Sequence, residues 1–355
     1  MSWSFHAVLG IAAAIVTVLA TGLVLRQLRA RAVLDLPNER SSHDRAVPRG
    51  GGIAVIAVVA GGWALLAWQR DGWRGDSFDL LAVAILAAAL AGISFLDDLR
   101  GMPALQRLLW QILAVALGCL VLPETPVFQG VLPPLADRLA AGFCWLWFIN
   151  LFNFMDGIDG ITVVEAGTIG LGITLVTAVM GGAGGVGGAG GLGAPAIIVA
   201  GAAIGFGFWN WHPAKIFLGD VGSVGLGLLL GWLLLSLAAV GQWLPALLLP
   251  LYYLTDATWT LLRRMFRGEK FWRAHRSHFY QHAARRCGNH AKVSLRVLCA
   301  NLVLIAAALW AALHKDNGLA PVLAAALGAM AVAILLYSFV TMKEQANRLD
   351  EANQS

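Results

Sequence analysis

The feature that most constrains this chain is the repetition of apolar runs near 20 residues in length along almost all of the sequence. A helix needs about 20 mostly apolar residues to cross the hydrocarbon core of a bilayer. Only 13% of the 355 residues are charged, whereas soluble domains usually carry about a quarter. The sequence therefore predicts an all-α, polytopic integral membrane protein that forms one transmembrane domain over residues 1–355, with no separate soluble domain.

The apolar runs predict eleven transmembrane helices. Their expected bounds are Phe5 to Leu25, Gly52 to Trp68, Leu80 to Phe95, Leu108 to Leu122, Leu139 to Phe154, Thr162 to Met180, Ala194 to Trp211, Val224 to Val240, Trp243 to Leu262, Ser294 to Leu313 and Leu319 to Val340. The first run is too long for the apolar core of a secretory signal, and its nearest positive charge follows it, so we interpret it as an uncleaved anchor.

The loops between these runs differ in charge. Of the 25 Lys and Arg residues, 21 fall on the loops after spans one, three, five, seven and nine and on the carboxyl tail. The other loops hold only Arg70, Arg74, Arg138 and Lys315. Because positive residues are retained in the cytoplasm, the amino terminus is expected outside and the carboxyl terminus inside. The cytoplasmic set includes a basic loop, residues 263–293, and a polar tail, residues 343–355.

Five aspartates stand at the expected cytoplasmic ends of spans three, five and seven. They are Asp97, Asp98, Asp156, Asp159 and Asp220. Any one of them is explained as readily by a helix cap or a solvated loop, and Asp159 fits a cap especially well because a new apolar run begins three residues later. As a group they require a cation or basic partners nearby, since an ionised carboxylate close to lipid is costly unless it is paired.

The adjacent residues Asp97 and Asp98 cannot serve one ligand equally, because successive residues of a helix point about 100° apart. One of them can hold a metal while the other acts elsewhere. Carboxylate oxygens suit Mg²⁺, which is typically bound by one or two carboxylates together with substrate phosphates. The glycines of "GDVGS" (219–223) and "DGIDG" (156–160) let the backbone approach such a ligand and offer amide donors at a helix start. We therefore expect a diphosphate substrate.

The basic loop also carries four histidines, His275, His278, His282 and His290. One interpretation is a retention loop that rests on anionic lipid headgroups. The other is a clamp for a phosphate, to which the run "HRSH" (275–278) brings two imidazoles and a guanidinium within about one helical turn. This run suits an anion better than a tetrahedral zinc ion, because no cysteine or acid accompanies it.

The motifs occur in the order typical of one family. The segments "SHDRAVPRGGG" (42–52), the pair at 97–98, "NFMDGIDG" (153–160), "FLGDVGS" (217–223) and the histidine loop together resemble the polyprenyl-phosphate N-acetylhexosamine-1-phosphate transferases, over about residues 26–281. The resemblance implies an enzyme of the bacterial inner membrane with its active site on the cytoplasmic face. Its implied reaction moves a sugar-1-phosphate from a UDP-N-acetylhexosamine to undecaprenyl phosphate and releases UMP.

The resemblance also implies roles for individual residues. Asp220, with Asn153 and Asp156, would bind Mg²⁺, for which Mn²⁺ could substitute. Asp97 and Asp98 would be the catalytic residues nearest the attacking phosphate, acting as base, nucleophile or electrostatic partner. The implied substrate-binding residues are Arg45, Arg49, Asp159, Lys215, His275, Arg276 and His278.

The run "HFYQ" (278–281) departs from the histidine-rich pattern of many family members. It resembles the O-antigen initiating branch, which often uses 6-deoxy N-acetylsugars. Membrane lipids are expected partners, nucleic acids are not, and a homodimer stays open beside a monomer. Two rival functions are an intramembrane prenyltransferase, which would need two aspartate-rich DxxxD repeats, and a transporter of an anionic substrate, whose acids would lie near mid-membrane.

Overall fold

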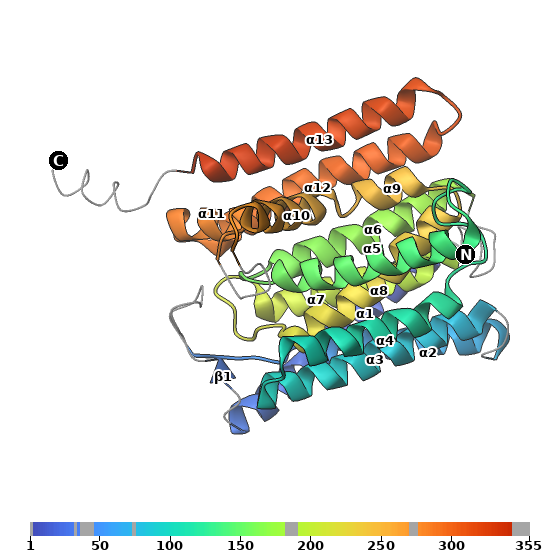
Figure 1. Cartoon of the computed structure of the whole chain (residues 1–355). Helices are drawn as coiled ribbons and strands as arrows, with labels where there is room; N and C mark the ends of the chain where they lie inside the picture. The colour runs from blue at the N-terminus through green and yellow to red at the C-terminus, as the bar shows by residue number, and fades with distance from the viewer. Residues whose placement is uncertain are drawn as a thin grey trace.

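The computed structural model describes residues 3–31, 34–35, 46–72, 76–181, 191–269 and 276–342. Its α-helices are α1 (Trp3–Ala30), α2 (Gly52–Asp71), α3 (Asp76–Arg100), α4 (Ala104–Gly118), α5 (Pro134–Phe154), α6 (Ile161–Val179), α7 (Gly193–Asn210), α8 (Asp220–Ala239), α9 (Trp243–Leu248), α10 (Leu251–Phe266), α11 (Phe279–Cys287), α12 (His290–Leu313) and α13 (Leu319–Val340). A short 3-10 turn, η1 (Cys119–Val121), follows α4, and β1 (Leu34–Asp35) pairs antiparallel with β2 (Val47–Pro48). The long helices lie side by side in one bundle, with β1 and α11 at the same end (Figure 1).

The predicted all-α, polytopic fold is confirmed. In the part of the chain that the structure describes, ten helices are long and apolar enough to cross a membrane, namely α1 to α8, α12 and α13. The prediction of an eleventh continuous span, Trp243 to Leu262, is wrong, because the chain divides there into α9 and α10. The division falls at Pro250, which has no N–H to continue the helical hydrogen bonds. The orientation of the bundle across the membrane stays a prediction.

Helix α8 forms the centre of the bundle. It contacts α2, α3, α5, α6 and α9, and nearly all of its side chains are buried. By contrast, α1, α4 and α13 present large apolar side chains to the outside, for example Leu19, Leu109 and Leu323. A polytopic membrane protein faces lipid with such surfaces. The first residue of α8, Asp220, therefore stands at the end of the most enclosed helix.

The close contact between α1 and α7 depends on small residues. Gly201 and Gly205 lie one turn apart on α7, and a Cβ atom at either position would overlap a backbone carbonyl of α1, that of Gly10 or of Ala14. These α1 residues are themselves one turn apart. Small residues at this spacing let two membrane helices approach backbone to backbone, which strengthens their dispersion contacts. The pair α1 and α7 is thereby fixed in register.

We expect Gly201→Ala to destabilise the protein by about 1–3 kcal/mol, because the new methyl group must push α1 away from α7. The measurement is thermal unfolding of the purified protein in detergent. Gly92→Ala in α3 is the matched control, since a Cβ atom there meets no atom within 4 Å and alanine favours the helix. Equal melting temperatures for the two variants would contradict the assigned α1–α7 contact.

Candidate active site

A backbone pairing between two of the sequence motifs builds one end of the bundle. The Phe217 amide donates to the Pro48 carbonyl at 2.9 Å, and two glycine amides of "RGGG" donate to the Phe217 carbonyl at 3.1 and 2.9 Å. The pairing continues the chain from β2 directly into α2. It holds Arg49, which lies between these hydrogen bonds, beside the start of α8 and its first residue, Asp220.

Two carboxylates from different helices converge on this arginine. The Arg49 Nη2 atom lies 3.1 Å from Asp98 Oδ1, at the end of α3, and 2.5 Å from Asp220 Oδ1, at the start of α8. Gly219 precedes Asp220 with a φ of +77°, a conformation that favours glycine. A Cβ atom on Gly219 would also lie only 3.0 Å from Asp98 Oδ2. The glycine thus permits the close approach of α3 and α8 that brings the two acids together.

Asp97 has different partners from its neighbour. Its Oδ1 accepts a hydrogen bond from the Met102 amide at 2.5 Å, and its Oδ2 lies 3.4 Å from Arg107 Nη1 on α4. The same Arg107 atom lies 3.7 Å from Asp220 Oδ2. The adjacent acids therefore face separate partners, as the helical geometry predicts. Arg107 is a functional candidate that the sequence motifs do not include. From the sequence it was expected only as one of the basic residues of the loop after span three.

This cluster of Asp97, Asp98, Asp220, Arg49 and Arg107, which we call the acid cluster, has three negative and two positive side chains. Within the described residues, the buried Asp98 Oδ2 atom has no hydrogen-bond partner. The acids are mostly enclosed, but the arginine side chains are 38% and 44% exposed. An oxygen-rich site with one unpaired acceptor and a solvent-exposed side can accept a cation, and partly exposed guanidinium groups at its edge can bind phosphate.

Asn153, in the last turn of α5, and Asp156, just after this helix, lie next to this cluster. Asn153 Oδ1 accepts from the Ser223 hydroxyl on α8 at 2.6 Å, and Asn153 lines a cavity together with Asp97 and Asp220. Asp156 accepts from the Thr162 hydroxyl at 2.5 Å. Burial raises the pKa of the Asp156 carboxyl to about 6, although the Thr162 hydrogen bond and the charge of Arg49 act in the opposite direction.

The cavity beside the acid cluster has a volume of about 580 Å³ and lies between α3, α4, α5 and the start of α8. Its polar lining is concentrated in Asp97, Arg107, Asn153 and Asp220, while the rest is mainly Leu, Ile, Phe and Trp side chains. One further polar contact crosses it, from Asn150 Nδ2 to Gln111 Oε1 at 2.8 Å. A ligand with an anionic head and an apolar chain fits this division.

The histidine loop is tied to the same end of the bundle through a buried aspartate that sequence reasoning missed. Asp256 on α10 accepts from the amides of Phe279 and Tyr280 at 3.1 and 3.2 Å, which caps the start of α11. Its Oδ1 also lies 3.4 Å from the buried His278 Nδ1. An acid inside the apolar run of residues 243–262 was the available signal, because such residues are costly without a partner.

The residues of the variant run "HFYQ" serve packing in this structure. Tyr280 is buried, and its hydroxyl donates to the Phe154 carbonyl at 3.0 Å, beside Gly157. The Gln281 side chain accepts from the His278 amide at 3.4 Å. These contacts dock α11 against the "NFMDG" turn. The substrate-binding role of His278 stays a prediction, since its ring faces Asp256 here.

The other predicted substrate-binding residues lie in different surroundings. Lys215 is exposed, and its Nζ atom lies 5.9 and 5.4 Å from the ring centroids of Phe208 and Trp209. The Arg276 carbonyl accepts from Arg285 Nη2 at 2.9 Å. Arg45 and His275 lie outside the described residues. The roles of all four stay predictions.

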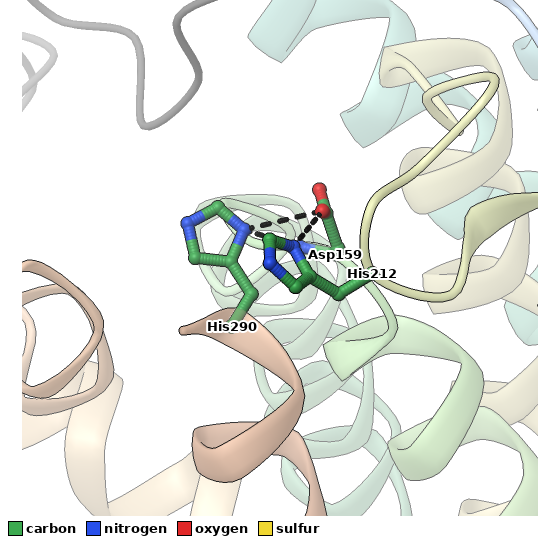
Figure 2. Close-up of side chains that lie close together, drawn as sticks. All are labelled: Asp159, His212 and His290. Atoms are coloured by element: carbon green, nitrogen blue, oxygen red, sulfur yellow. Dashed lines mark hydrogen bonds and ion pairs between the residues drawn. The ribbon is translucent and has the colours of Figure 1, made fainter. Parts of the chain in front are cut away.

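Asp159 belongs to a second group, with His212 and His290 (Figure 2). The interpretation of Asp159 as a helix cap is wrong: Gly160 occupies the N-cap position of α6, and no side-chain capping bond is made there. The Asp159 Oδ2 atom instead lies 2.7 Å from His212 Nδ1 and 3.4 Å from His290 Nδ1. Burial alone would raise the pKa of Asp159, but contacts with His290 and His212 and the Ala214 amide together hold it below its ordinary value. Its predicted role in substrate binding stays a prediction.

Comparison with known proteins identifies relatives of the region that contains these residues. Residues 80–238 match the family model described as glycosyl transferase family 4. The decaprenyl-phosphate N-acetylglucosaminephosphotransferase of Mycobacterium tuberculosis is 32% identical, over 63% of this chain and 58% of its own length. The probable undecaprenyl-phosphate N-acetylglucosaminyl 1-phosphate transferase of Bacillus subtilis is 27% identical, over 70% and 68%. The phospho-N-acetylmuramoyl-pentapeptide-transferase of Pelotomaculum thermopropionicum is 34% identical, over 60% and 69%.

The match to the family model includes Asp97, Asp98, Asn153, Asp156 and Asp220. The chain spans 58% of the length of the mycobacterial relatives that it matches. It covers 69% of the Pelotomaculum relative, at 34% identity. The family predicted from the order of the motifs is thus confirmed, and the chain belongs to glycosyl transferase family 4, the superfamily of polyprenyl-phosphate N-acetylhexosamine-1-phosphate transferases.

Proposed function

We propose that the protein transfers an N-acetylhexosamine-1-phosphate from a UDP-sugar to a polyprenyl phosphate, with undecaprenyl phosphate as the acceptor. An oxygen of the acceptor phosphate forms a new P–O bond to the sugar-bearing phosphorus of the donor. The bond from that phosphorus to the oxygen bridging the two phosphates breaks, and UMP leaves with this oxygen. The names of the relatives support this reaction above prenyl transfer or transport.

The observation that carries the proposal is that three members of the acid cluster, Asp97, Arg107 and Asp220, line a cavity that is otherwise largely apolar. Arg49 and Arg107 are paired with Asp98, Asp220 and Asp97 and keep partly exposed side chains. They can neutralise a phosphate that enters the cluster, while an isoprenoid chain lies along the Leu, Phe and Trp side chains of α3, α4 and α5. Phosphoryl transfer depends mainly on such positioning and charge neutralisation.

The donor atoms also fit magnesium, which the family resemblance implies. The carboxylates of Asp220 and Asp98 present hard oxygens to one point, and Asp98 Oδ2 has no hydrogen-bond partner among the described residues. We assign the ion to Asp220 and Asp98, with Asn153 at the end of α5 and Asp156 on the turn after it, and with Mn²⁺ as a substitute. When bound, the ion would offset charge that develops on the diphosphate.

The acceptor phosphate needs little help to lose a proton, because a phosphate monoester has a second pKa near 6. We therefore favour direct attack by this phosphate. Asp97, held by the Met102 amide and Arg107, would orient Arg107 toward it. The alternative is that Asp98 acts as the nucleophile. The negative charge of the donor diphosphate would repel its carboxylate, which disfavours this route. A phospho-aspartyl peptide recovered from enzyme in turnover would overturn direct attack.

Asp220→Asn should lower the rate of UMP release by at least about 100-fold, since it removes a charge at the point where the acids converge. The assay uses purified protein, radiolabelled UDP-sugar, undecaprenyl phosphate and Mg²⁺. Chelation should abolish wild-type activity, and added Mg²⁺ or Mn²⁺ should restore it. Asp316→Asn, in the exposed loop after α12, is the matched charge control. Full activity of the Asp220 variant, or of the chelated enzyme, would remove the metal assignment.

A wide side chain in the apolar part of the cavity should hinder the lipid and not the nucleotide. Leu108 lines the cavity on α4, whereas the next residue, Leu109, faces outward. Leu108→Trp should raise the KM for undecaprenyl phosphate by about tenfold or more, with little change in the KM for the UDP-sugar. Leu109→Trp should leave both constants near their wild-type values. The same KM change in both variants would place the lipid elsewhere.

The histidine loop bears on which sugar the enzyme transfers. The run "HRSHFYQ" supports a 6-deoxy N-acetylhexosamine and the start of lipid-linked O-antigen synthesis, whereas two of the relatives are named for N-acetylglucosamine. We expect UDP-N-acetylfucosamine or UDP-N-acetylquinovosamine to give a higher kcat/KM than UDP-N-acetylglucosamine. The measurement is UMP release with each donor in turn. A preference for UDP-N-acetylglucosamine would assign the enzyme to another branch.

A further inference from the structure

Three side chains from separate segments meet near the amino-terminal end of α6. Asp159 comes from the turn after α5, His212 from the loop between α7 and α8, and His290 is the first residue of α12. The Nδ1 atoms of His212 and His290 lie 2.7 and 3.4 Å from the same oxygen, Asp159 Oδ2. Figure 2 shows both rings turned toward this carboxylate. All three candidate ligand atoms lie within 4.8 Å of one another.

These donor atoms are available to a metal ion. The Asp159 amide lies 3.3 Å from His290 Nδ1 and donates to it, so this nitrogen is unprotonated, and an ion would replace the long hydrogen bond that it accepts. His212 and His290 keep 29% and 13% of their side-chain surface exposed, while Asp159 is nearly buried. An ion can therefore enter from the solvent side, and a water molecule can complete its coordination. A neutral imidazole is the form that ligates metals.

The separations are close to those of a bound ion. Two ligands in a tetrahedral site with bonds of about 2.0 Å lie roughly 3.3 Å apart. The distance from His290 Nδ1 to Asp159 Oδ2, 3.4 Å, already matches this value. The distance from His212 Nδ1, 2.7 Å, would have to increase by about 0.6 Å. A small rotation of an exposed ring is sufficient for that.

We propose that Asp159, His212 and His290 bind one transition-metal ion of the Zn²⁺ class, at a site separate from the acid cluster. Two imidazoles and one carboxylate suit Zn²⁺ or Co²⁺, whereas Mg²⁺ prefers oxygen ligands alone. In the metal-free protein, a proton on His212 Nδ1 holds the group together through its bond to Asp159. When the ion binds this nitrogen, the proton moves to Nε2 of the same ring, so that a neutral imidazole ligates the metal.

The site would join three segments that already share contacts. The Ser294 hydroxyl on α12 donates to the Asp159 carbonyl at 2.9 Å, and the Gly160 amide donates to Asn210 Oδ1, at the end of α7, at 3.0 Å. A metal would convert this hydrogen-bonded junction into a stronger link between α6, α7 and α12. The inference stands on this geometry and does not depend on the proposed transferase reaction.

The test uses full-length protein in detergent, freed of its affinity tag and stripped of metal. Titration with Co²⁺ should give visible absorption typical of a site with nitrogen and oxygen ligands, with one ion bound per chain. Zn²⁺ should displace the Co²⁺ and raise the melting temperature, whereas Mg²⁺ should do neither. X-ray absorption of the Zn²⁺ form should show two imidazole ligands, a result that no variant is needed to interpret.

His290→Gln and His212→Asn should each weaken Co²⁺ binding by about tenfold or more, because each removes one of three protein ligands. His290→Gln is the milder change, since its contact to Asp159 is the longer one. His314→Gln, at the other end of α12, is the control and should bind like the wild type. Absence of stoichiometric Co²⁺ binding by the wild type, or equal binding by all three variants, would reduce the group to a hydrogen-bonded junction and overturn the proposal.

Discussion

The pairing of Asp98 and Asp220 with Arg49 is the interaction on which the rest of the site depends. Carboxylates at the ends of apolar helices are costly unless a positive charge or a cation accompanies them. The structure meets this requirement with a backbone pairing of residues 48–52 and 217–218, which sets the guanidinium between α3 and α8. Asp98 and Asp220 thus have a positive partner beside a cavity whose walls are largely apolar.

The turn between α5 and α6 connects two chemically different places. Asp156 is enclosed, and burial raises its pKa to about 6. The charge of Arg49 acts to lower this pKa, whereas that of Asp220 acts to raise it. Three residues later, Asp159 turns away to the histidines, and its pKa is lowered. The α11 helix supports this turn from the other side, since Tyr280 donates to the Phe154 carbonyl and Asp256 caps the helix that carries it. One short segment therefore couples the acid cluster, the histidine group and the basic loop.

The apolar runs and the charge pattern predicted the fold well, because membrane spans are recognisable in a sequence by their length and apolar composition. The span at residues 243–262 is the exception, and Pro250 inside it is the residue that signals the break. The sequence also predicted that the acids of three motifs would lie close together, since each stands at a helix end. It could not predict that Arg107 would reach Asp97, because that contact depends on the turn between α3 and α4. It also could not predict that His212 and His290 would face Asp159, because these contacts arise from helix packing across 53 and 131 positions. Local spacing suggested that Asp159 caps a helix, but in the fold its carboxylate lies against two distant histidines.

The two ends of the acid cluster differ in how firmly they are anchored. Asp220 begins α8, which is enclosed by neighbouring helices along nearly all of its length, whereas Arg107 belongs to α4, whose residues are mostly exposed on the outside of the bundle. A change in bilayer thickness acts on a peripheral helix through the lipid that surrounds it. The composition of the membrane therefore bears on the placement of the guanidinium of Arg107, while the carboxylate of Asp220 is shielded from it.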